Sequence, residues 1–106
     1  MGLTHELVSD LRREIAPMLL FSGRSAIYVG IGWAPEVAQW VAARGLIILG
    51  LEGFDCDGAH LFPRLDRIAD LSDVTDPERS AEAATSLVRQ WRRDVQWIDF
   101  VLAPAE

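Results

Sequence analysis

Two glycines in this chain stand where a ligand could approach the backbone closely. Gly30 and Gly32 follow an apolar run at 26–31 and precede a helical pattern that opens at Pro35. A glycine turn between a strand and a helix suits nucleotide binding, because no Cβ keeps the ligand away. The dinucleotide pattern has a third glycine where Pro35 stands, and a phosphate-binding P-loop needs a lysine that is absent here. A tight turn that merely requires small residues is the alternative interpretation.

A second group of reactive side chains crowds a stretch of nine residues: Glu52, Asp55, Cys56, Asp57 and His60. Zinc prefers three or four ligands of the Cys and His type, and only two are present here. The spacing also fails the pattern of a calcium-binding loop. A nucleophilic pair of Cys56 and His60 would lack an orienting third group, and neighbouring carboxylates disfavour the thiolate. We therefore predict a polar turn, with no metal site and no catalytic residues.

Composition excludes further kinds of chemistry. The chain has 106 residues and a net charge of −6, and its ten basic residues are all arginine. Without lysine there is no Schiff-base chemistry. The absence of both lysine and asparagine indicates a GC-rich, bacterial source. The negative charge argues against nucleic acid as a partner, and no apolar run is long enough to cross a membrane. We expect a single cytoplasmic α/β domain over residues 1–106.

Alternating apolar runs and amphipathic patterns predict how this domain is built. The expected elements are a helix at 4–15, a strand at 26–31, a helix at 35–44, a strand from 46, a helix at 76–93 and a strand at 97–102. Strands that are joined through helices usually pair in parallel. The pattern therefore predicts a small, mostly parallel four-stranded sheet with helices on both faces. This is a Rossmann-like three-layer sandwich, preceded by an N-terminal helix.

The segment between the second strand and the last helix allows two interpretations. In the first, which we favour, Pro63 opens a short helix that carries Leu61 and Leu65 inward, and residues 68–71 form a third parallel strand. In the second, Asp57 and Gly58 form a turn that folds the chain back onto the second strand as an antiparallel hairpin.

A family resemblance follows from these motifs. The runs Y-V-G-I-G-W-A at 28–34 and W-I-D-F-V-L-A-P at 97–104 flank two acids that end predicted strands, Glu52 and Asp70. This arrangement resembles the N-terminal half of class I S-adenosylmethionine-dependent methyltransferases. The resemblance implies that Gly30 and Gly32 approach the cofactor, that Glu52 holds the ribose hydroxyls and that Asp70 lies by the adenine. Because only half of such an enzyme is present, it implies binding and not catalysis by this chain alone.

The distribution of charge supports a different function. Residues 46–78 contain eight acids and two arginines, which equals the net charge of −6 of the whole chain. In a parallel sheet, the loops that carry these acids would meet at one edge. We therefore expect a non-catalytic protein that binds a basic protein partner through its acidic 52–78 edge, as immunity and inhibitor proteins do. The predicted contact residues are Trp33, Glu52, Phe54, Asp55, Asp57, Asp70 and Asp73.

Two other functions remain open. The first is a minimal Rossmann-like binder of S-adenosylmethionine or a related nucleoside, with Gly30, Gly32, Glu52 and Asp70 as its ligand-binding residues. The cationic sulfonium of this cofactor would tolerate an acidic edge, whereas a nucleoside triphosphate would be repelled. The second is a subunit of a larger enzyme, assembled as a homo-oligomer or with another chain through the N-terminal helix and the four tryptophans.

Overall fold

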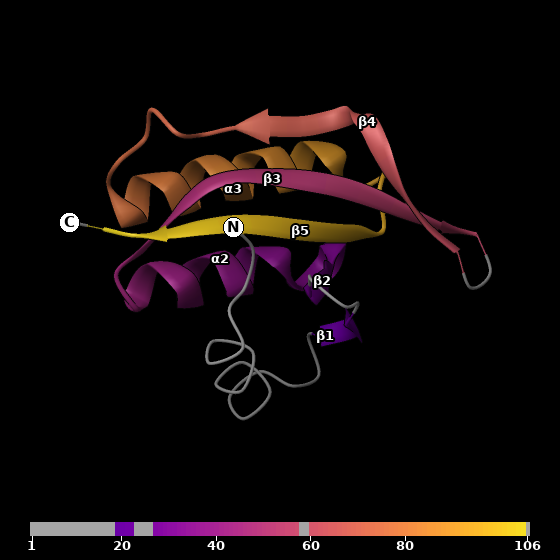
Figure 1. The fold of residues 1–106 in the computed structure, drawn as a ribbon, viewed down its shortest axis with the longest axis horizontal. Helices are drawn as coiled ribbons and strands as arrows, with labels where there is room; N and C mark the ends of the chain where they lie inside the picture. The colour runs from indigo at the N-terminus through magenta and orange to yellow at the C-terminus, as the bar shows by residue number, and fades with distance from the viewer. Residues whose placement is uncertain (1–18, 23–26, 58–59, 106) are drawn as a thin grey trace.

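In the part of the chain that the structure describes, five strands form an antiparallel sheet and two α-helices pack on one face of it (Figure 1). The computed structural model describes residues 19–22, 27–57 and 60–105, and the predicted helix at 4–15 lies outside them. In chain order the elements are β1 (Leu19–Ser22), β2 (Ile27–Gly30), the 3-10 turn η2 (Ile31–Trp33), α2 (Ala34–Ala43), β3 (Leu46–Asp57), β4 (His60–Asp70), α3 (Pro77–Trp91) and β5 (Trp97–Pro104). The strand order across the sheet is β1-β2-β5-β3-β4.

The predicted parallel, Rossmann-like sheet is wrong. Every pair of neighbouring strands is antiparallel, and both described helices share one face. The local pattern that suggested a parallel pair is nevertheless present, because β2 and β3 run in the same direction on either side of α2. The last strand, β5, lies between them and pairs with both. A crossover helix identified from sequence therefore does not establish that its two strands are hydrogen-bonded neighbours.

The antiparallel hairpin, which was the second interpretation of the middle segment, is confirmed. β3 continues from Leu46 through Asp57, and β4 returns from His60 to Asp70 along its outer side. No short helix opens at Pro63, because this residue lies within β4 and pairs with Phe54. Proline is tolerated there because β4 is the edge strand.

The two helices begin and end as their sequence signals predict. α2 has a proline in its first turn and is followed by Gly45, whose φ of 73° is the left-handed conformation of a helix C-cap. α3 begins after Asp76, whose Oδ2 accepts a hydrogen bond of 3.0 Å from the backbone N–H of Arg79. Neither these helices nor any other in the described ranges is long and apolar enough to cross a membrane.

The core lies between the helices and the sheet. From β5, Ile98, Phe100 and Leu102 alternate with half-buried residues, so this face of the strand is turned towards the helices. One buried polar residue connects the two layers: Ser80 of α3 accepts a 3.0 Å hydrogen bond at Oγ from the N–H of Ile48. The pairing of β3 with β5 is irregular between Ile48 and Gly50. At this irregularity the hydroxyl of Ser80 supplies the hydrogen-bond acceptor for the backbone N–H of Ile48.

Candidate functional site

The acidic residues of 52–78 do not share one edge, because the hairpin separates them. Asp55 and Asp57 lie near its tip, which extends beyond the helices in Figure 1. Asp70 and Asp73 lie at the opposite end, where β4 leads into α3. Glu52 is in the middle of β3, between these groups. The predicted single acidic edge depended on parallel strands, and it is therefore wrong as a geometric unit.

The outer strand of the hairpin carries a large bulge. Glu52 pairs with Ile68 and Phe54 pairs with Pro63, so residues 64–67 of β4 lie opposite the single residue Gly53. A Cβ at Gly53 would come within 2.7 Å of Cγ1 of the buried Val95. Glycine is needed at this position because the loop between α3 and β5 passes directly over the strand.

Two arginines of the bulge bind this same loop. Arg64 donates hydrogen bonds of 2.8 Å to Oδ2 of Asp55 and 2.7 Å to the backbone oxygen of Asp94. Arg67 donates to Oδ2 of Asp94 from two nitrogens, at 2.6 and 3.1 Å. Both arginines also contact Asp66, and the hydrogen bond from Arg64 lowers the pKa of that carboxyl from its usual value. The bulge is therefore held by charge-assisted hydrogen bonds on both sides.

Apolar side chains are exposed along this outer strand. Leu65, between the two anchored arginines, is 79% exposed, and Ile68 and Phe62 are 51% and 42% exposed. The predicted inward position of Leu65 is wrong, because it belonged to a helix that does not form. Sequence reasoning missed this surface, since alternation of apolar residues alone does not reveal which strand lies at a sheet edge.

The two predicted aromatic contact residues have different environments. Trp33 is 41% exposed at the end of η2, and its role as a contact residue stays a prediction. Phe54 is half-buried in the sheet, and its ring packs edge-on against Tyr28 with 5.0 Å between the centroids. Phe54 therefore contributes to sheet packing and is a poor anchor for a partner.

Two carboxylates face each other at the centre of the sheet, on the side away from α2 and α3. Glu52 of β3 and Asp99 of β5 are direct cross-strand partners. Burial, together with the charge of Glu52, raises the pKa of Asp99 to about 6. Oδ1 of Asp99 is shielded from solvent and has no hydrogen-bond partner among the described residues. Burial and these two carboxylates also raise the pKa of the neighbouring Tyr28.

The residues predicted to bind a nucleoside are not brought together. Gly30 ends β2 and Gly32 lies in η2, where a Cβ would meet nothing within 4 Å. Glu52 is two strands away from Gly30, and Asp70 lies at the far end of the hairpin. The turn is held by a 2.9 Å hydrogen bond from the N–H of Ile31 to the oxygen of Gln96. S-adenosylmethionine binding stays a prediction. The edge of a parallel sheet, where the ligand was expected to lie, is not formed by the described strands.

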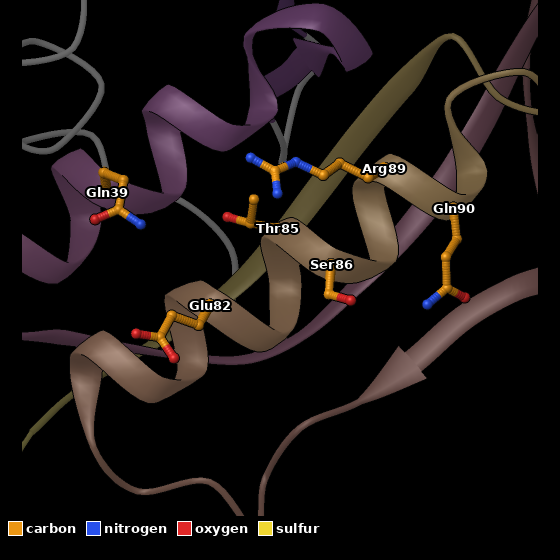
Figure 2. A pocket seen from close by; sticks show the side chains of 6 residues that line it. All are labelled: Gln39, Glu82, Thr85, Ser86, Arg89 and Gln90. Carbon is orange, nitrogen blue, oxygen red and sulfur yellow. The ribbon is translucent and has the colours of Figure 1, made fainter.

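A polar hollow of about 570 Å³ lies between α2 and α3, on their outer side (Figure 2). Gln39 of α2 faces it, together with Thr85 and Arg89 of α3, and the same three residues line an adjoining hollow of about 290 Å³. Figure 2 shows the guanidinium of Arg89 extending over Thr85 towards α2. Oγ1 of Thr85 is buried and has no hydrogen-bond partner in the described ranges. Sequence analysis placed no function here, since the hollow exists only where two helices meet.

The sequence predicts no zinc or calcium site around Cys56 and His60. These two residues lie on opposite strands, near the end of the hairpin. Within residues 19–22, 27–57 and 60–105, no three side chains of the Cys, His, Asp or Glu type gather as metal ligands would. The backbone N–H of Cys56 donates a 3.1 Å hydrogen bond to Oε1 of Gln96, which ties the hairpin to the start of β5.

Comparison of this chain with protein-family models, with curated proteins and with solved structures finds no match.

Proposed function

We propose that this protein is a non-catalytic binding protein and that it holds a basic protein partner on β4, with Leu65 at the centre of the contact. The observation that carries this proposal is the exposure of Leu65, at 79%, on a bulge fixed by charge-assisted hydrogen bonds. A large apolar side chain costs free energy when it is left in water, and binding a partner removes that cost. Ile68 extends the same surface along the strand.

The fixed bulge favours binding for a second reason. Arg64 and Arg67 hold both sides of the bulge against Asp55 and Asp94, so its backbone is already ordered before a partner arrives. A contact surface that is ordered in advance loses less conformational entropy on association. The central side chain of such a surface typically contributes more to affinity than the polar residues around it.

Charge determines the kind of partner that we propose. The two arginines of the bulge form ion pairs with three carboxylates, those of Asp55, Asp66 and Asp94, so this cluster carries one more negative than positive charge. The whole chain carries a net charge of −6, which attracts a basic surface and increases the rate of encounter. The acidic groups at the two ends of the hairpin would contribute to this long-range attraction. They need not form one contact patch.

A photo-crosslinking amino acid at position 65 tests the proposal in the source cells. We expect it to capture a basic protein, and the same amino acid at the exposed Arg79 of α3 should not capture that protein. With the captured partner purified, Leu65→Ser should weaken binding at least tenfold, which corresponds to about 1.4 kcal/mol. The exposed Gln90→Ser should leave the affinity unchanged. Equal capture from both positions, an acidic partner, or an unchanged affinity of Leu65→Ser would each overturn the proposal.

A further inference from the structure

The polar hollow between α2 and α3 contains donor groups that the described part of the protein leaves unused. Arg89 makes no ion pair or hydrogen bond with another described residue, although it extends across the hollow (Figure 2). The hydroxyl of Thr85 below it is shielded from solvent and is also unbonded. A buried hydroxyl without a partner is costly. A ligand oxygen would reach this hydroxyl once the guanidinium of Arg89, which extends over Thr85, turned aside to hold the ligand.

These donors have the chemistry of a carboxylate site. A guanidinium offers two parallel N–H donors that match the two oxygens of a carboxylate, and charge-assisted bonds of this kind are the strong ones. The hydroxyl of Thr85 and the side-chain amide of Gln39, which faces the hollow from α2, supply further donors. The hollow is open to solvent, since five of its six lining residues are exposed, so a ligand would lie along the surface of the two helices.

Two glutamates determine which carboxylate the hollow would accept. Glu82 lines the hollow itself and Glu36 lines the part that adjoins it. Their charges oppose a multiply charged anion such as a phosphate, and they attract an ammonium group. Glu82 precedes Arg89 by seven residues, which places the two about 10 Å apart along α3. An extended peptide spans at most about 3.3–3.6 Å per residue, so three residues cover this distance.

We propose that the hollow between α2 and α3 binds a short peptide with free termini. Its C-terminal carboxylate lies on Arg89 and Thr85, and its amino group lies on Glu82. This site is on a different surface from β4 and involves none of the residues that we propose to contact the protein partner.

Titration of the isotope-labelled protein with trialanine, followed by NMR, tests this site. The amide signal of Thr85 and the Nε signal of Arg89 should shift saturably. Blocking the carboxylate as an amide, or Arg89→Gln, should weaken binding at least tenfold. Arg79→Gln, which removes an exposed arginine outside the hollow, should have no effect. Glu82→Gln should weaken binding of trialanine but not of its N-acetylated form.

Three results would overturn the proposal. The first is the absence of saturable shifts around the hollow, and the second is equal affinity for trialanine and its C-terminal amide. The third is binding of acetate as tight as that of trialanine, which would leave a carboxylate site without any role for the peptide. Leu65→Ser should bind trialanine normally, so the two proposals stand or fall separately.

Discussion

Glu52 and Asp99 lie directly opposite each other on neighbouring strands at the centre of the sheet. Like charges in this position repel, and the usual solution in an antiparallel sheet is an opposite charge or an apolar pair. Here burial and the charge of Glu52 raise the pKa of Asp99 to about 6. The native protein therefore retains a proton on Asp99 at mildly acidic pH, whereas the unfolded chain releases it at a pH near the ordinary value of 3.8.

This pair predicts that the protein loses stability as the pH rises from about 4 to about 6. In that window the native state binds more protons than the unfolded state, so the free energy of unfolding falls with increasing pH. Asp99→Asn removes the titration and should flatten this part of the profile. Because Asp99 is partly exposed to solvent, the gain in stability of the variant at neutral pH should be limited to about 1 kcal/mol. Thermal unfolding across this pH range measures the effect.

A matched control for this prediction is Asp66→Asn. The pKa of Asp66 is lowered, chiefly by its hydrogen bond from Arg64, so its contribution to stability is present above the ordinary pKa and is lost as the pH falls. The two substitutions should therefore act in opposite directions. A profile of Asp99→Asn with the same slope as that of the unmodified protein would show that Asp99 does not titrate in this window.

The bulge of β4 predicts that Gly53→Ala destabilises the protein. The added Cβ would lie 2.7 Å from Cγ1 of Val95 and 3.1 Å from Cβ of Arg67, so the loop or the bulge must move. Overpacking of this kind typically costs about 1–3 kcal/mol, which urea denaturation can measure. Gly32→Ala is the control, because open space surrounds that position, and its stability should change by less than about 0.5 kcal/mol. Equal effects of the two substitutions would contradict the close approach of Val95 to β3.

The contact between Ser80 and Ile48 predicts a third result. Ser80→Ala leaves the buried N–H of Ile48 without its 3.0 Å acceptor, which should cost about 1–3 kcal/mol. Hydrogen exchange should also accelerate at the amide of Ile48. Ser86→Ala changes the same residue type at an exposed position of α3, and its effect on stability should be small. If the amide of Ile48 stays equally protected in Ser80→Ala, the hydrogen bond does not connect the helix to the sheet.

Sequence and structure agree best where the determining interactions are local. The ends of α3 are encoded by Asp76 and by the apolar spacing of Ala84, Val88 and Trp91, which are close neighbours along the chain. The hairpin of β3 and β4 is one of two interpretations that the sequence allows, since the same residues also fit a helix and a third parallel strand. A choice between these alternatives depends on partners that are distant in sequence, and local patterns do not contain that information.

The sequence by itself determined the net charge of −6, the absence of lysine chemistry and the positions of the two described helices. Only the tertiary structure decided that β5 lies between β2 and β3, which reverses the expected pairing. That one insertion places Asp99 opposite Glu52, and the hairpin beside it leaves Leu65 on the outer strand. The physical reason is that helix caps and charges follow from neighbouring residues, whereas strand order follows from which distant apolar faces bury each other best.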